Sequence, residues 1–159
     1  MDITYGSDKN GLLCGYLFEN GAPGTPVDLA QASAWLRSEQ PKGQSDFVWL
    51  HFNLSDAAAE ACIHKHLDVV PEFFEALHEG SRSTRIEDAH DNLIAVVNDV
   101  AYEFAFDPAE IATLWLNVGP HLALSARSHP HPTCQMRVSW EIPAHQVCST
   151  AQKIVRNSQ

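Results

Sequence analysis

The residues best suited to chemistry in this chain are histidines and carboxylates. The sequence contains nine His, together with twenty Asp and Glu residues. Neutral imidazole and carboxylate oxygen are both good ligands for zinc. The densest group is Glu87, Asp88, His90 and Asp91, four candidate ligands within five positions. We interpret this group as the preferred cation patch, able to bind Mg²⁺ or Zn²⁺ weakly. The competing interpretation is a solvated turn, because surface carboxylates hold divalent ions poorly unless several converge.

A second candidate metal site consists of His129 and His131, with Cys134 nearby in a Pro-rich segment. In an extended chain the side chains at positions i and i+2 share a face, so the two imidazoles could converge on zinc. The alternative is a pair of incidental histidines, because ligands on a flexible segment lose chain entropy when they bind. His64 and His66 lie about 200° apart around an expected helix and cannot chelate one ion together.

Several classes of protein are disfavoured by the sequence. It contains no H-E-x-x-H, no G-x-S-x-G and no Gly-rich phosphate loop, so we expect no enzyme and no required cofactor. Residues 1–129 contain 7 Lys and Arg against 19 Asp and Glu, which disfavours nucleic-acid binding and attracts cations. The apolar stretches are far shorter than the ~20 residues of a membrane helix. Without a secretion signal the expected location is the cytoplasm.

Hydrophobic periodicity and turn residues predict an α/β domain that places the cation patch on a hairpin. Helices are expected after Asp28, from the caps Ser55 and Asp56 to about His66, and from Pro71 to a C-terminal cap at Gly80. Strands are expected at 12–18, 47–53, 82–87, 93–100, 111–118 and 121–127. His90 to Asn92 is the expected turn of one hairpin, and Gly119-Pro120 a two-residue type II′ turn of another.

Three stretches together resemble a known family: 47–56 (FVWLHFNLSD), 82–100 (RSTRIEDAHDNLIAVVNDV) and 114–127 (LWLNVGPHLALSAR). They are similar to the N-terminal cytoplasmic domain of the CorA metal-ion transporters, and most similar to the zinc-transporting ZntB branch. The segments 12–18 and 71–79 match the same branch in type and order. The resemblance implies a mixed, largely antiparallel sheet covered by helices in an αβα sandwich. It also implies a non-enzymatic domain of a Mg²⁺, Co²⁺ or Zn²⁺ transporter, with a regulatory or assembly role at the cytoplasmic face of the inner membrane.

The resemblance ends near residue 129, and we expect residues 130–159 to be a divergent, loosely ordered Pro-rich tail. The family's stalk, membrane helices and pore loop have no counterpart, so we expect a truncated gene product that cannot transport by itself. Glu75-Ala76 replaces a Glu-Asp pair of the magnesium members and lacks an oxygen ligand for a hard cation. Expected partners are divalent cations, further copies of the chain, or full-length transporter subunits. The alternatives are a stand-alone metal-binding or interaction module, or a small metalloenzyme.

Overall fold

The computed structural model describes residues 8–80, 83–100 and 111–128. His129 and His131, and the expected boundary to a tail, lie outside these residues. The elements, in chain order, are β1 (Leu12–Phe18), β2 (Thr25–Pro26), α1 (Leu29–Arg37), β3 (Phe47–Asn53), α2 (Ala59–His66), α3 (Pro71–Glu79), β4 (Arg85–Ala89), β5 (Asn92–Val100), β6 (Ile111–Val118) and β7 (Leu122–Arg127).

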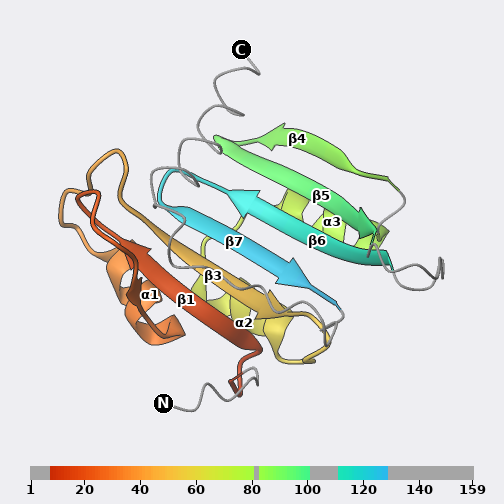
Figure 1. The fold of residues 1–159 in the computed structure, drawn as a ribbon, viewed down its shortest axis with the longest axis horizontal. Coiled ribbons are helices and arrows are strands. Elements are labelled where there is room, and N and C mark those ends of the chain that lie inside the picture. Colours follow the sequence, from red (N-terminus) through yellow and green to blue (C-terminus); the bar gives the residue numbers. More distant parts are fainter. Residues whose placement is uncertain (1–7, 81–82, 101–110, 129–159) are drawn as a thin grey trace.

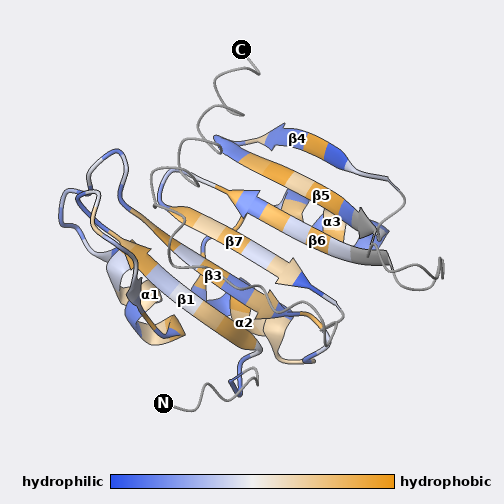
Figure 2. Cartoon of the chain, in the orientation of Figure 1, coloured by the Kyte–Doolittle hydropathy of each residue, from blue (hydrophilic) through white to orange (hydrophobic). Residues whose placement is uncertain are grey.

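The strands form one seven-stranded sheet in the order β2-β1-β3-β7-β6-β5-β4 (Figure 1). Only β3 and β7 pair in parallel, and every other neighbouring pair is antiparallel. The expected mixed, largely antiparallel sheet with covering helices is therefore confirmed. In Figure 2 the edge strand β4 has a hydrophobic band between hydrophilic residues, and charged side chains on an edge strand discourage pairing with another chain.

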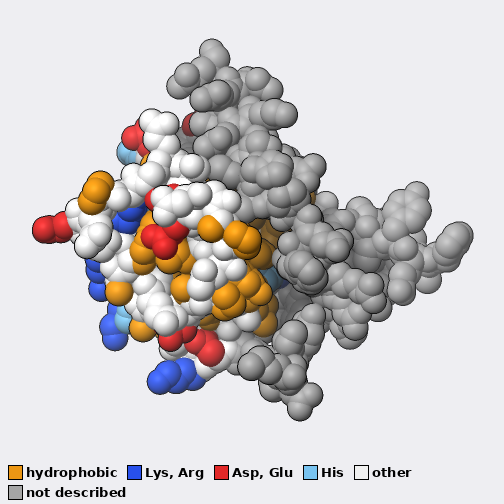
Figure 3. Space-filling view, turned by 60° about the vertical axis from the view of Figure 1, so that its left-hand side comes forward, with side chains coloured by type: hydrophobic (Ala, Val, Ile, Leu, Met, Phe, Trp, Pro, Cys, Tyr) orange, Lys and Arg blue, Asp and Glu red, His pale blue; other side chains and the backbone are white. Residues whose placement is uncertain are grey.

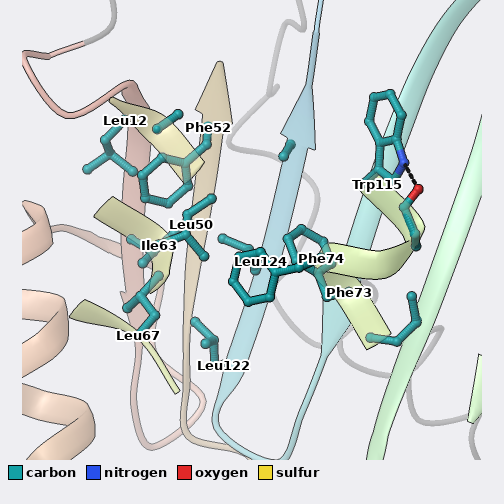
Figure 4. Close-up of a cluster of buried hydrophobic side chains, with 14 of the residues drawn as sticks. Leu12, Leu50, Phe52, Ile63, Leu67, Phe73, Phe74, Trp115, Leu122 and Leu124 are labelled. Atoms are coloured by element: carbon teal, nitrogen blue, oxygen red, sulfur yellow. Dashed lines mark hydrogen bonds between the residues drawn. The ribbon is translucent and has the colours of Figure 1, made fainter. Parts of the chain in front are cut away.

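The core lies between one face of the sheet and the helices. Val48, Leu50 and Phe52 alternate along β3 and are fully buried. Their partners in the parallel register on β7 are the apolar residues Leu122, Leu124 and Ala126, so both strands present one continuous apolar face. Residues of all three helices join this cluster, including Ile63 of α2 and Phe73 and Phe74 of α3 (Figure 4). The described helices thus form one layer on the same face.

Two of the helix boundaries follow the predicted signals closely. Asp28 caps α1 by accepting the Gln31 backbone N–H at 2.8 Å, and the Gln31 side chain accepts the Asp28 N–H in return. Pro71 occupies the first turn of α3, which ends at Gly80 with a φ of 73°. A positive φ costs glycine little, so Gly80 allows the chain to leave the helix sharply.

The predicted start of α2 is wrong by several residues. The helix begins at Ala59 and has no side-chain cap. The Asp56 carboxylate instead accepts the backbone N–H of Ala58 at 2.9 Å, which closes a local turn before the helix. Asp and Ser compete with helix formation through such local bonds, and this is why they mark turns as well as caps.

The predicted type II′ turn between β6 and β7 is also wrong. Three residues connect the strands, and the Gly119 N–H donates to the Leu122 carbonyl at 2.8 Å. Gly119 does not have the positive φ that this turn requires. The following Pro120 explains the difference, because a proline pushes the residue before it towards an extended conformation. The β4–β5 hairpin does turn at the expected place, with positive φ at His90 and Asp91.

Candidate metal site at the β4–β5 turn

The four predicted ligands of the cation patch lie on one hairpin but face different surroundings. Glu87 is paired with Arg85, whose Nε lies 3.1 Å from Glu87 Oε1. Asp88, the next residue of β4, is exposed and points to the opposite face of the sheet, because side chains alternate along a strand. Asp91 is exposed at the turn. Within residues 8–80, 83–100 and 111–128 no three His, Cys, Asp or Glu side chains gather as a metal site.

His90 contacts a carboxylate that the sequence pattern did not single out. Its Nε2 lies 3.2 Å from Oε1 of Glu72, in the first turn of α3. The His90 side chain is 77% exposed and that of Glu72 is 35% exposed. The second carboxylate oxygen, Glu72 Oε2, is fully buried and has no hydrogen-bond partner. The structure therefore joins an accessible imidazole to a carboxylate that has an unsatisfied oxygen.

The two halves of this pair are held by separate parts of the core. On the helix side, Phe73 and Phe74 are buried beneath α3, and the Trp115 indole N–H donates to the Ala76 carbonyl at 3.1 Å (Figure 4). These contacts fix α3 against β6, so the Glu72 carboxylate is presented from a rigid element.

On the hairpin side, side-chain amides brace the turn. Asn92 Nδ2 donates to the His90 carbonyl at 2.9 Å, and Asn117 Nδ2 lies 3.4 Å from Asn92 Oδ1. Asn117 is fully buried in β6, so this chain of amides connects the turn to the core. The backbone that carries His90 is therefore held in place, while its ring remains open to solvent.

A second imidazole–carboxylate pair lies near the other end of α3. His78 Nε2 is 2.8 Å from Glu60 Oε1, which links α3 to α2. The pair lines a cavity of about 230 Å³ that is also walled by Leu54, Leu77 and Trp115. Both side chains are largely exposed. Each end of α3 is therefore tied to a neighbouring element by one histidine and one glutamate.

A third polar group lies on the sheet face opposite the described helices. Ser125 Oγ is 2.8 Å from His51 Nδ1 and accepts the Trp49 indole N–H at 3.0 Å. Burial, and next the positive charge of Arg127, lower the pKa of His51 below its usual value. A serine beside a neutral histidine resembles a nucleophile and its base. Ser125, however, is only 4% exposed, which fits a structural hydroxyl rather than an accessible nucleophile.

The negative charge of the chain is not concentrated on the side of the molecule formed by β1 and α1. Figure 3 shows that side with hydrophobic side chains in the middle and acidic side chains at several separate places. A divalent-cation site on this side would need several carboxylates close together. The two pairs at the ends of α3 therefore remain the best candidates for cation contacts.

Comparison with known proteins shows which solved structures share this fold. No protein-family model matches the chain, and no curated protein does. Among solved structures, the cytoplasmic domain of ZntB from Vibrio parahaemolyticus matches 77% of this chain with a TM-score of 0.52 and 10% identity. The described fold is similar to that of the ZntB cytoplasmic domain. The full-length CmaX protein matches 79% of the chain with a TM-score of 0.61 and 20% identity.

The resemblance to ZntB that the sequence predicted is thus confirmed at the level of the fold. The chain spans less than half of either neighbour, covering 46% of the ZntB domain and 37% of CmaX. No helix within the described ranges is long and apolar enough to cross a membrane. The metal-binding roles of Glu87, Asp88, His90 and Asp91 stay predictions.

Proposed function

We propose that this chain is a non-enzymatic cytoplasmic domain of a divalent-cation transporter of the CorA and ZntB type, with a regulatory or assembly role. The observation that carries the proposal is the ZntB-like fold of the described sheet and helices. Its net charge of −10 is a further support, because an acidic surface raises the local concentration of cations. The transported or sensed ion would be Mg²⁺, Co²⁺ or Zn²⁺.

In this proposal the domain acts by a population shift and catalyses no reaction. A cation that binds one arrangement of subunits more tightly than another shifts the equilibrium towards that arrangement. The exposed imidazole–carboxylate pairs at both ends of α3 are the groups through which an ion could act. The partners would be further copies of this chain or intact transporter subunits.

Sedimentation velocity with and without divalent ions tests the proposal. We expect weak, concentration-dependent self-association that changes when Zn²⁺ or Mg²⁺ is added, and calorimetry should detect heat of binding. A chain that remains monomeric at high protein concentration and gives no heat with either ion would contradict the regulatory role. Co-purification with an intact transporter of this type would test the assembly role separately.

A further inference from the structure

We propose that residues 129–159 of this chain pack on the face of the sheet opposite α1, α2 and α3. We call it the second face, and in Figure 1 it lies towards the viewer, with α2 and α3 behind the strands. An antiparallel sheet that leaves one face to solvent normally carries polar residues there. The second face is instead largely apolar, and no helix of the described ranges packs on it. A sheet that is apolar on both faces requires a second covering layer.

The half of the second face formed by β5 and β6 is aliphatic. Its side chains are register partners across the two strands, and the three pairs are Leu93 with Val118, Ala95 with Leu116, and Val97 with Leu114. Leu93 is 6% exposed and Ala95 is 3% exposed, yet neither belongs to the core cluster beneath the helices. The second face therefore has a buried apolar layer of its own, to which the described helices do not contribute.

The half formed by β1 and β3 is aromatic. Tyr16 stacks on Trp49 with ring centroids 6.1 Å apart, and Phe18 stacks on Phe47 at 4.7 Å. Between the two halves lies Ser125, which is 4% exposed and contacts both the Trp49 indole N–H and the His51 ring. Because these polar groups contact one another, an apolar layer can cover them without leaving them unpaired.

The sequence of the proposed covering segment contains two amphipathic stretches. Apolar residues alternate strictly with polar ones from 134 to 142, which is typical of a strand with one apolar face, and they are Cys134, Met136, Val138, Trp140 and Ile142. The prolines at 130, 132 and 143 lie outside this run. A second set has the spacing of one side of a helix and consists of Val147, Cys148, Ala151, Ile154 and Val155. Both stretches have an apolar side to bury.

Length, charge and attachment favour this segment as the occupant. It follows the end of β7, which is the middle strand of the seven. Nine extended residues span about 30 Å, whereas the distance across the sheet from β3 to β4 is about 19 Å. Residues 130–159 have three basic residues and one acidic residue, and the rest of the chain is strongly acidic. A tethered segment has an effective concentration in the millimolar range, so it competes well against a second copy of the chain.

NMR of the whole chain tests the contact directly. We expect nuclear Overhauser effects between the Trp140 ring and the methyl groups of Leu114 or Leu116. A sample that mixes isotope-labelled and unlabelled chains separates contacts within one chain from contacts between chains. The absence of such effects would overturn the proposal. Effects found only between chains would also overturn it, because a second copy would then be the occupant.

A matched pair of variants tests the same contact through stability. Val138→Asp places a charge on the apolar side of the alternating run, whereas Ser139→Asp adds the same charge to its polar side. We expect Val138→Asp to lower the urea midpoint on the order of 1 M and Ser139→Asp to leave it unchanged. Val138→Ala is a milder change that should lower the midpoint by less, so the test holds even if Val138→Asp does not fold. Val138→Ala and Ser139→Asp with the midpoint of the parent chain would refute the docking. Neither result depends on the response to divalent ions that tests the proposed function.

Discussion

Replacing Asn117 with valine should stabilise the protein, although it removes a hydrogen bond. Asn117 is fully buried in β6 with Ile94 and Leu124 as its register partners, and its Oδ1 has no hydrogen-bond partner. A buried polar group left unpaired costs about 1–3 kcal/mol. The bond from Nδ2 to Asn92 Oδ1 is long at 3.4 Å, so its contribution should lie near the lower end of about 0.5–1.5 kcal/mol. Valine suits a strand, and the net expected gain is about 1 kcal/mol.

Equilibrium unfolding in urea measures this gain. With a slope of about 1–3 kcal/mol per molar urea, the midpoint should rise by roughly 0.3–1 M and the slope should not change. Thr113→Val is the control, because Thr113 is buried in the same strand but its hydroxyl donates to Asn98 Oδ1 at 3.0 Å. That variant should gain nothing or lose stability. If Asn117→Val lowered the midpoint instead, the Asn117 amide would have to be satisfied, and the reasoning would be wrong.

Three further predictions concern titrating or buried groups. Burial and the charge of Arg127 hold the pKa of His51 in the folded protein below 6.5. As the pH falls below 6.5, the unfolded chain therefore binds a proton at this residue before the folded protein does. The free energy of unfolding should then drop by up to about 1.4 kcal/mol per pH unit. His51→Gln should flatten this slope in urea unfolding, and an unchanged slope would contradict the assignment. Two backbone N–H groups lower the pKa of Asp46 below 3.8, so its stabilisation is present above that pH and lost below it. Asp46→Ala should lower the melting temperature at neutral pH and weaken its dependence on acid, whereas an unchanged melting temperature would count against this role. Ala76→Asp should cost about 3 kcal/mol or more, because it buries an unpaired carboxylate beside Trp115, and a variant with normal urea stability would refute this.

Most of the fold could be predicted because its signals are local. The alternation of Val48, Leu50 and Phe52 defines the buried face of β3 without any knowledge of its neighbours. The start and end of α3 follow from Pro71 and Gly80 for the same reason. The wrong predictions arose where two local rules compete. Asp56 can cap a helix or close a turn, and Pro120 overrides the freedom of the glycine before it.

The candidate site was harder to predict, because its decisive contact joins residues that are 18 positions apart in sequence. Glu72 has the sequence signature of an ordinary acidic residue in the first turn of a helix. Nothing local indicates that α3 would bring it to His90. Strand alternation could have shown that Glu87 and Asp88 point to opposite faces of the sheet. The sequence alone could therefore have shown that these two carboxylates do not bind the same ion.

The burial of Ala76 gives a physical reason why this position of α3 holds no carboxylate. Ala76 is 3% exposed, and its carbonyl accepts the indole N–H of Trp115, so this position belongs to the core. A second carboxylate after Glu75, as the magnesium members of the resembled family have, would be buried here without a donor. Glu72 lies four residues earlier, on the same side of the helix, where the chain can place a carboxylate beside an imidazole. Position 76 therefore belongs to the core and cannot hold a solvated carboxylate, whereas position 72, one turn earlier, holds a carboxylate at the helix surface.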